Sequence, residues 1–208
     1  MIKVAIVDDH ALMRQGIKNV LNLNKNIQVV IEAANGKIFL EELNQENLPD
    51  VVLLDIQMPE MDGYETLAVL QDQYPDLKVI MLSMIQDDFI VNNLLLRGAA
   101  AFISKTTEAG DFLSTIDKVF EGSIPPPKRI RDFSEKSEEN AGLITNKEME
   151  FLKYCPTYLT YDQIAARMLV SPKTLDHYRI SLFKKLKVQS RSELAGMAVK
   201  MGFGKTGF

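Results

Sequence analysis

Short apolar runs alternate with amphipathic stretches along the first 121 residues of the chain. Runs of β-branched residues and leucine predict five strands, over residues 2–7, 27–33, 51–54, 78–83 and 101–104. Apolar residues at helical spacing follow each strand and predict helices over 11–23, 39–43, 64–70, 89–96 and 112–120. Five such units predict an α/β fold: a doubly wound parallel sheet of five strands, flavodoxin-like, with helices on both faces.

The last third of the chain has helical spacing throughout, so we expect a second, smaller all-α domain. Two capping boxes, Thr145 with Glu148 and Thr160 with Gln163, open its first two helices. A third helix starts at a serine-proline pair and runs over residues 172–186, and a fourth follows it. A short helix, a tight turn and a longer helix form the helix-turn-helix arrangement.

Residues 122–142 separate these two parts. Three consecutive prolines give this segment a stiff start, and its remaining serines and charges cannot bury a core. We therefore expect a first domain over 1–121, a linker over 122–142 and a second domain over 143–208.

Composition narrows the class of protein. An apolar content of 46% and a charged content of 25% are those of a soluble globular protein. No apolar stretch approaches the ~18 residues of a membrane span, and no signal peptide precedes the first strand, so we expect a cytoplasmic protein without a membrane partner. The one cysteine, Cys155, excludes an internal disulfide framework and a cysteine-rich zinc site, and we expect it to be half-buried in a helix.

Charge is distributed unevenly between the two parts. Residues 1–121 contain 19 acidic and 9 basic side chains, whereas residues 143–208 contain 5 acidic and 11 basic ones. This asymmetry indicates that only the second domain meets a polyanion.

Polar side chains stand at the carboxyl ends of four predicted strands. Asp8 and Asp9 follow the first strand, Asp55 the third and Lys105 the fifth, and Ser83 ends the fourth. Because these ends share one edge of a parallel sheet, we expect the five side chains to converge there. A single acid at a strand end is usually a cap, but five such residues at successive strand ends indicate a reactive site.

The expected site has the chemistry of phosphoryl transfer to a carboxylate. Three neighbouring carboxylates repel one another, and a hard divalent cation such as Mg²⁺ removes that conflict. The cation also offsets the repulsion between a phosphoryl group and a carboxylate nucleophile. The Lys105 ammonium and the Ser83 hydroxyl can donate to phosphoryl oxygens.

These residues resemble the receiver domain of two-component response regulators, over residues 1 to about 121. The resemblance rests on Asp8-Asp9, Asp55 with the Met-Pro-Glu-Met-Asp-Gly segment at 58–63, Ser83, and the segment 98–105 that ends in Lys105. It implies that Asp55 accepts a phosphoryl group from a histidine kinase, assisted by Lys105 and Ser83. It further implies that Mg²⁺ is held by Asp9, Asp55 and the backbone carbonyl of Gln57, with Asp8 acting through water. Ser83 and Phe102 would be the switch pair.

Two departures from the receiver pattern bear on the switch. Phe102 has no hydroxyl, so the switch would work by packing. Thr106 stands where many receivers have proline, and a non-proline cis bond costs about 2.5–4 kcal/mol, so the geometry of the Lys105–Thr106 bond stays open. Phosphatases of the haloacid-dehalogenase type are the alternative, but they need a general acid at the position of Gln57, which cannot protonate a leaving group.

The second domain resembles the LuxR-type DNA-binding domain. The resemblance rests on Ile-Thr-Asn-Lys-Glu at 144–148, Gln-Ile-Ala at 163–165, Val-Ser at 170–171, Lys-Thr-Leu at 173–175, Lys-Leu at 185–186 and Val-Gln-Ser-Arg at 188–191. With a receiver in front, the whole chain resembles a NarL/FixJ-type response regulator, which implies a transcription factor that binds the major groove of double-stranded DNA as a homodimer. The implied base-reading residues are Asp176, His177 and Ile180, and the other implied DNA-binding residues are Lys173, Thr174, Tyr178, Lys184 and Lys185.

Several residues depart from the LuxR-type pattern. Asp162 and Asp176 replace frequent lysines, Tyr178 replaces the usual histidine, and Tyr158 replaces a glycine. The two aspartates keep an alternative open, in which the helical domain is a protein-interaction module that does not bind DNA. The apolar residues at 194, 197 and 201 have two interpretations, a dimer seam or the domain core. Enzymatic activity is expected only as self-catalysed phosphoryl transfer and hydrolysis in the receiver.

Overall fold

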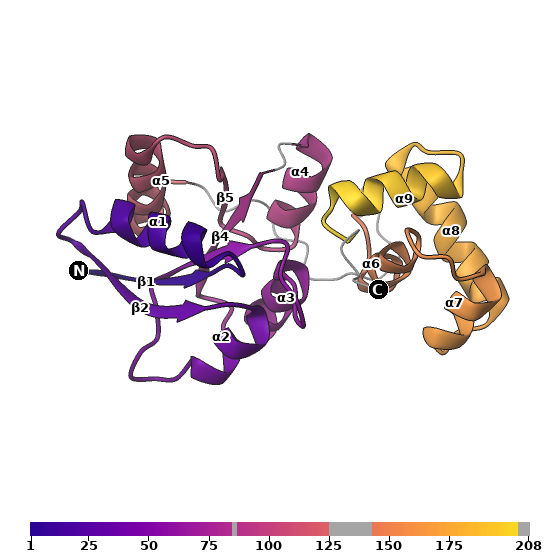
Figure 1. Ribbon diagram of the computed structural model, residues 1–208, viewed down its shortest axis with the longest axis horizontal. Coiled ribbons are helices and arrows are strands. Elements are labelled where there is room, and N and C mark those ends of the chain that lie inside the picture. Colours follow the sequence, from indigo (N-terminus) through magenta and orange to yellow (C-terminus); the bar gives the residue numbers. More distant parts are fainter. Residues whose placement is uncertain (85–86, 125–142, 204–208) are drawn as a thin grey trace. The chain divides into compact units, whose positions relative to one another are not determined.

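The chain divides into two compact units in the computed structural model, which describes residues 1–84, 87–124 and 143–203 (Figure 1). The N-terminal unit spans Met1–Arg129 and the C-terminal unit spans Ile130–Phe208. The predicted linker over 122–142 lies almost wholly outside the described residues, so its bounds remain a prediction. In the described ranges, no helix is long and apolar enough to cross a membrane.

Five parallel strands form the sheet of the N-terminal unit in the order β2-β1-β3-β4-β5, which confirms the predicted sheet. They are β1 (Ile2–Val7), β2 (Ile27–Ala33), β3 (Val51–Asp55), β4 (Lys78–Ser83) and β5 (Ala101–Ser104). All of β3 is buried, as expected for a strand that is covered on both faces. The strand order reverses between β1 and β3, and α/β proteins bind ligands beside such a reversal.

Five helices cover the two faces of this sheet, again as predicted (Figure 1). They are α1 (Ala11–Leu21), α2 (Gly36–Glu42), α3 (Gly63–Gln73), α4 (Asp88–Leu96) and α5 (Ala109–Glu121). On one face, Ile17 and Leu21 of α1 and Ile116 of α5 pack in a single apolar cluster with alternate residues of the strands. The strand residues between these point to the opposite face, because side chains alternate along a strand.

The first helix is shorter than predicted. It ends at Leu21, and Leu23 is 73% exposed. The chain turns there, with the Asn24 N–H donating to the Leu21 carbonyl, to reach the start of β2 at Ile27. Leu12, an apolar residue within the predicted helix, is 87% exposed because the buried face of α1 is centred on Ile17 and Leu21.

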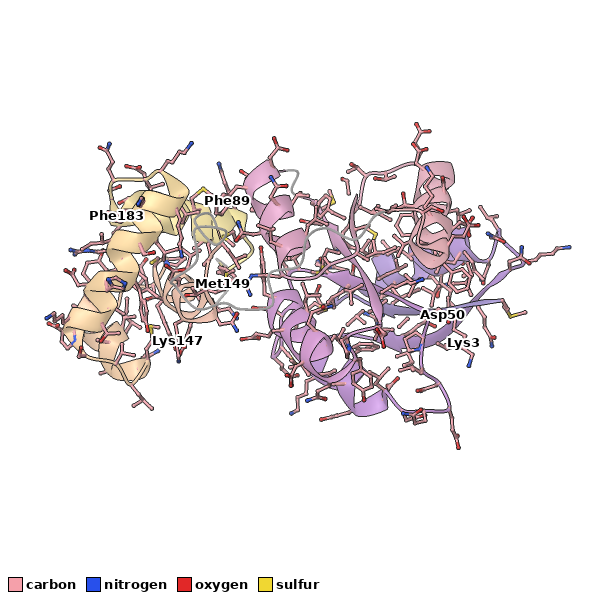
Figure 2. All side chains as sticks on the ribbon, turned by 180° about the vertical axis from the view of Figure 1, so that it is seen from behind. Lys3, Asp50, Phe89, Lys147, Met149 and Phe183 are labelled. Atoms are coloured by element: carbon pink, nitrogen blue, oxygen red, sulfur yellow. The ribbon has the colours of Figure 1, made fainter. Side chains whose placement is uncertain are left out.

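Hydrogen bonds near the amino ends of β1 and β3 fix their alignment. The Lys3 N–H donates to Asp50 Oδ2 over 2.7 Å, and the Asp50 N–H donates to the Lys3 carbonyl over 2.8 Å (Figure 2). In this register Val7 pairs with Leu54. The next residues, Asp8 and Asp55, therefore leave neighbouring strands side by side.

The described part of the C-terminal unit contains four helices, as predicted. They are α6 (Asn146–Tyr154), α7 (Tyr161–Arg167), α8 (Pro172–Leu186) and α9 (Arg191–Lys200). Both predicted capping boxes are formed, and Ser171 caps α8 with proline in its first turn. The turn between α7 and α8 includes Leu169, whose φ of 55° is left-handed. The helix-turn-helix arrangement is therefore present in α7 and α8.

Burial in the C-terminal unit corrects the prediction for Cys155 and decides between core and dimer seam for two residues of α9. Cys155 is 2% exposed, not half-buried, and burial raises the pKa of its thiol to about 12, so it is unreactive at neutral pH. Leu194 and Met201 are 0% and 1% exposed, and Met197 is half-buried. Leu194 and Met201 therefore belong to the core of the unit, and for the half-buried Met197 a place in a dimer seam stays a prediction. Leu186 is only half-buried at the end of α8.

Candidate functional site

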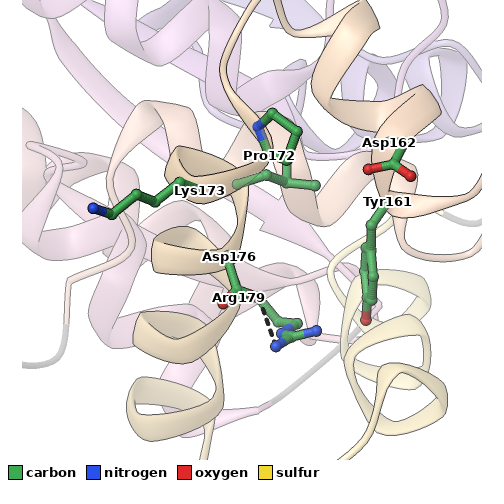
Figure 3. A pocket seen from close by; sticks show the side chains of 7 residues that line it. Tyr161, Asp162, Pro172, Lys173, Asp176 and Arg179 are labelled. Carbon is green, nitrogen blue, oxygen red and sulfur yellow. Dashed lines mark ion pairs between the residues drawn. The ribbon is translucent and has the colours of Figure 1, made fainter.

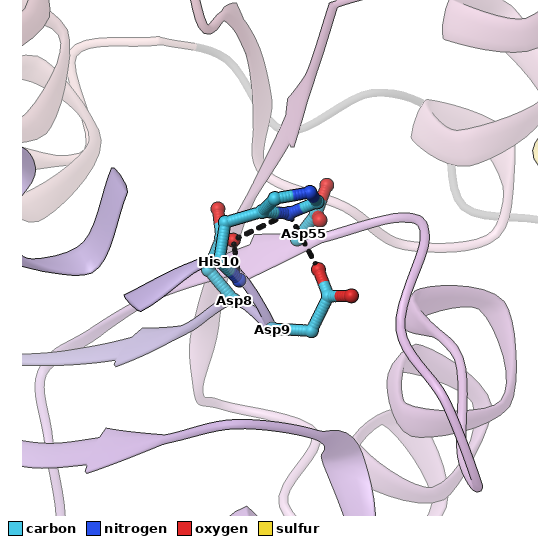
Figure 4. Close-up of side chains that lie close together, drawn as sticks. All are labelled: Asp8, Asp9, His10 and Asp55. Carbon is cyan, nitrogen blue, oxygen red and sulfur yellow. Dashed lines mark hydrogen bonds and ion pairs between the residues drawn. The ribbon is translucent and has the colours of Figure 1, made fainter. Parts of the chain in front are cut away.

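An acidic cluster lies beyond the carboxyl ends of β1 and β3. Possible ligand atoms of Asp8, Asp9, Asp55 and His10 all lie within 4.8 Å of one another (Figure 4). Asp8 and Asp55 are buried, whereas Asp9 is half-buried and His10 is exposed. The predicted convergence of the three carboxylates is thus present in the structure.

Lys105 joins two of these carboxylates. Its Nζ lies 2.7 Å from Asp8 Oδ2 and 2.9 Å from Asp55 Oδ2, and its side chain is only 7% exposed. Burial raises the pKa of Asp55, and the Lys105 ammonium opposes that rise without cancelling it. Burial lowers the pKa of Lys105, but the carboxylates of Asp55 and Asp8 outweigh this and raise it overall. Lys105 therefore stays charged near neutral pH.

The loop after β3 holds Asp55 in place through backbone contacts. The Ile56 N–H donates to Asp55 Oδ1 over 2.8 Å, and a hydrogen bond from the Gln57 backbone also lowers the pKa of the carboxyl. The loop then folds back, so that the Gly63 N–H donates to the Ile56 carbonyl over 2.9 Å. Any side chain at Gly63 would clash with the Asp55 carbonyl oxygen, which explains the glycine.

The predicted switch residues lie on neighbouring strands. Ser83 is buried at the end of β4, and its carbonyl accepts the Lys105 N–H over 2.8 Å. Phe102 is half-buried on β5, where it pairs with Met81. The peptide bond after Lys105 is trans, and no cis bond occurs between described residues. This answers the question that Thr106 raised.

His10 belongs to the cluster but did not stand out in the sequence. Its Nδ1 lies 2.7 Å from Asp9 Oδ1, and its backbone N–H donates to Asp8 Oδ1 over 2.9 Å. The signal was its position directly after two aspartates at a strand end. Carboxylate and carbonyl oxygens suit Mg²⁺ better than imidazole does. The oxygen donors present therefore fit Mg²⁺, and His10 is better placed to orient Asp9 than to act as a ligand.

A second candidate surface lies on α8 in the C-terminal unit. Of the predicted DNA-binding residues, five are exposed: Lys173, Asp176, His177, Ile180 and Lys184. Thr174 and Tyr178 are half-buried, and Thr174 Oγ1 lies 2.8 Å from Ser171 Oγ. Ile180 is 58% exposed, so its apolar side chain lies on the same solvent-facing side of α8 as the other exposed residues.

Lys185 differs from the other predicted contacts. Its Nζ lies 2.8 Å and 2.7 Å from the two carboxylate oxygens of Glu148, which is fully buried, and the lysine side chain is 13% exposed. Burial alone would raise the pKa of Glu148, but hydrogen bonds from Lys185, Ser181 and the Thr145 N–H lower it below its usual value. The capping-box glutamate of α6 thus also ties α6 to α8. Sequence reasoning missed this pair, because its members are 37 residues apart.

Family models match both units. The model for the response regulator receiver domain matches residues 4–117, more than half of the chain, and the model for bacterial regulatory proteins of the luxR family matches residues 143–198. The chain belongs to the NarL/FixJ-type response regulators. It is therefore a two-component transcription regulator, in which a phosphorylation-controlled receiver is joined to a DNA-binding domain.

Curated relatives of this response regulator match along nearly the whole chain. The response regulator protein VraR of Staphylococcus epidermidis is 33% identical over 196 residues, which cover 92% of this chain and 93% of VraR. The response regulator GacA of Pseudomonas aeruginosa is 32% identical over 209 residues, which cover 97% of both chains. The two-domain organisation is therefore shared with these relatives.

Solved structures show the same fold. RcsB from Salmonella enterica serovar Typhimurium, solved bound to promoter rprA with a phosphomimetic, superposes with a TM-score of 0.69 at 21% identity, covering 95% of this chain and 98% of RcsB. The receiver domain of a NarL response regulator from Mycobacterium tuberculosis has a TM-score of 0.55 at 33% identity, covering 58% of this chain and 97% of that domain. Both agree with the α/β receiver, and RcsB also has the second, helical domain.

Proposed function

We propose that Asp55 is the phosphoacceptor of this response regulator and that a sensor histidine kinase is its donor. The observation that carries the proposal is the position of the Asp55 carboxylate, held at the sheet edge between Lys105 and the backbone N–H of Ile56. Gln57 occupies the position at which a phosphatase of the haloacid-dehalogenase type would need its general acid, and a glutamine cannot protonate a leaving group.

Transfer would take place at Asp55 Oδ2. This oxygen attacks phosphorus, a P–O bond forms, and the P–N bond of a phosphohistidine breaks, with its electron pair going to the imidazole nitrogen, which takes a proton from water. The Lys105 ammonium, 2.9 Å from this oxygen, is placed to move onto a phosphoryl oxygen, and the Ser83 hydroxyl to donate to another. Hydrolysis of the acyl phosphate by water would return the receiver to its resting state.

The acids around Asp55 form the proposed Mg²⁺ site. Asp9, Asp55 and the backbone carbonyl of Gln57 would hold the ion, with Asp8 acting through water. When bound, Mg²⁺ supplies positive charge that offsets the repulsion between the phosphoryl oxygens and the carboxylates. Asp8 is already paired with Lys105, which supports an indirect role for this carboxylate.

Labelling of Asp55 is the direct test of this assignment. Incubation with a small-molecule phosphodonor and Mg²⁺ should add one phosphoryl group to the full-length protein, as measured by intact mass, and none to Asp55→Asn. Asp72→Asn, which removes an exposed aspartate on α3, is the matched control and should be labelled like the wild type. Equal labelling of Asp55→Asn and the wild type would show that another residue is the acceptor.

The C-terminal unit would bind double-stranded DNA through α8. We propose that Asp176, His177 and Ile180 face base edges in the major groove and that Lys173 and Lys184 contact phosphates, because these five side chains are exposed on one helix. Thr174 and Tyr178 would add contacts with the sugar-phosphate backbone of the DNA. Lys185 is the weakest of the proposed phosphate contacts, since Glu148 already neutralises its ammonium. Phosphorylation would act through Ser83 and Phe102 to favour a DNA-binding homodimer.

Salt dependence tests the two lysines. The logarithm of the association constant of the phosphorylated protein for promoter DNA should fall linearly with the logarithm of salt concentration. Lys173→Gln and Lys184→Gln should each reduce that slope by about one unit per site, whereas Lys185→Gln should change it less. Fluorescence anisotropy from ~50 to ~300 mM salt measures the slopes. If no variant or wild-type protein bound DNA at ~50 mM salt, the protein-interaction alternative would replace this proposal.

A further inference from the structure

Asp176, at the exposed face of α8, is held by a neighbouring arginine. Asp176 Oδ1 lies 2.6 Å from the terminal Nη2 of Arg179, one helical turn further on. The guanidinium carbon of Arg179 lies 5.3 Å from the ring centroid of Tyr161, the first residue of α7. Figure 3 shows the Arg179 side chain extending from Asp176 towards the Tyr161 ring, whereas Lys173 points away from it.

Tyr161 is in turn fixed by the body of the C-terminal unit. The guanidinium carbon of Arg191, at the start of α9, lies 5.2 Å from its ring centroid, and the ring of Phe151 on α6 lies 6.2 Å away. Arg191 also donates to the Thr157 carbonyl over 2.8 Å, and Phe151 is fully buried. A continuous series of contacts therefore runs from the core of the unit through Tyr161 and Arg179 to Asp176.

This arrangement differs from an ordinary ion pair on a helix surface. Exposed pairs at this spacing stabilise proteins little, since two mobile side chains must be ordered in water. Here the arginine is already ordered against an aromatic ring and its side chain is only 33% exposed, while that of Asp176 is 51% exposed. The carboxylate is therefore pre-oriented, and the loss of side-chain entropy on binding is reduced.

The pairing also removes the main objection to an acid in a DNA interface. A lone carboxylate is repelled by phosphates, but Arg179 neutralises Asp176 locally. With Oδ1 turned to the arginine, Oδ2 is left as an acceptor on the exposed face that also carries His177 and Ile180. The base edge that offers a lone donor in the major groove is N4–H of cytosine.

We propose that Asp176 selects a cytosine in each half-site, and that Arg179, stacked on Tyr161, is a positioning residue for this contact. The proposal rests on the DNA-binding role of α8 proposed above and specifies what that helix prefers. Arg179 orients Asp176 and does not itself contact the base, because it is the less exposed partner and is directed towards Tyr161 on α7.

Selection of bound sites from random DNA by the phosphorylated full-length protein tests this inference. The wild type should enrich one cytosine per half-site, and changing that base or replacing it with N4-methylcytosine should weaken binding about tenfold. 5-Methylcytosine, which keeps the N4–H, should not weaken binding in this way. Asp176→Asn should shift the preference at this position towards adenine, because an amide matches the adenine edge.

Two further variants separate positioning from charge. Arg179→Lys keeps the positive charge and hence the salt slope. It should lose most of the preference for cytosine, because an ammonium lacks the planar guanidinium that stacks on Tyr161 and holds the Asp176 carboxylate in one orientation. Asp162→Asn removes the other aspartate of the same cavity between α7 and α8 and should raise affinity for all sequences equally, without changing the selected base. Retained folding of each variant is checked by circular dichroism.

Three results would overturn the inference. If Asp176→Asn selected the same base as the wild type, Asp176 would not be the residue that recognises this base. An undiminished preference for cytosine in Arg179→Lys would show that the arginine does not position it. Failure of the wild type to bind any DNA in salt-dependent fashion would instead remove the proposed function of α8, and the inference with it.

Discussion

Replacing Lys105 with glutamine should lower the free energy of unfolding of the N-terminal unit by about 3 kcal/mol in Mg²⁺-free solution. The substitution leaves the buried carboxylates of Asp8 and Asp55 without the ammonium that lies within 2.9 Å of both. Removal of one partner from a buried ion pair is costly because the remaining charge stays desolvated. The same variant should be labelled by a phosphodonor about 100-fold more slowly, since a donor to the transferred group is lost.

Native-state hydrogen exchange of the full-length protein, followed in peptides from residues 1–124, measures the stability change. Lys37→Gln is the matched control, because Lys37 forms an exposed pair with Glu60 at 3.9 Å, and it should cost less than about 0.5 kcal/mol. Added Mg²⁺ should restore more stability to Lys105→Gln than to the wild type, since the cation then supplies the only compensating charge. Equal stability of Lys105→Gln and Lys37→Gln would contradict the proposed role of the ammonium.

Replacing Glu148 with glutamine should have a comparable effect on the C-terminal unit, about 3 kcal/mol near neutral pH. The fully buried carboxylate accepts from Lys185 and from the Thr145 N–H, so its loss weakens both the α6–α8 ion pair and the cap of α6. Glu150→Gln is the control on the same helix. Glu150 forms an exposed pair with Lys147 at 2.8 Å, and its replacement should cost no more than about 0.5 kcal/mol.

The effect of Glu148→Gln should depend on pH. The pKa of Glu148 is lowered in the folded state, so the unfolded state binds the proton more readily. The carboxylate's contribution is therefore complete above the unfolded value of about 4.5 and is lost as pH falls through the lower folded value. Hydrogen exchange or thermal unfolding between pH 7 and pH 3 should show the wild type approaching the variant on the acid side. A constant difference over this range would mean that the ion pair is not its source.

The positions of five polar residues at the ends of predicted strands were sufficient to place the candidate site, although His10 was missed. Asp8, Asp9, Asp55, Ser83 and Lys105 follow apolar runs of strand length, and parallel strands bring their carboxyl ends to one edge. The starts of α6 and α7 were equally predictable, because their capping boxes, such as Thr145 with Glu148, depend on residues three apart. Interactions this local in sequence are encoded by spacing alone.

The tertiary structure decided which partners those residues meet. The sequence motif predicted that Lys185 contacts DNA, but its ammonium is paired with Glu148. Asp176 stands where a lysine contact was expected to be lost, but its carboxylate is paired with Arg179, which is stacked on Tyr161. Leu194 and Met201 formed an apolar stripe that fitted either a dimer seam or a core, and they are buried in the core. Periodicity determines which face of a helix is apolar or charged, and this much the sequence settled for both units. What covers or pairs with that face depends on how distant helices pack, so only the folded chain could assign Glu148 to Lys185 and Tyr161 to Arg179.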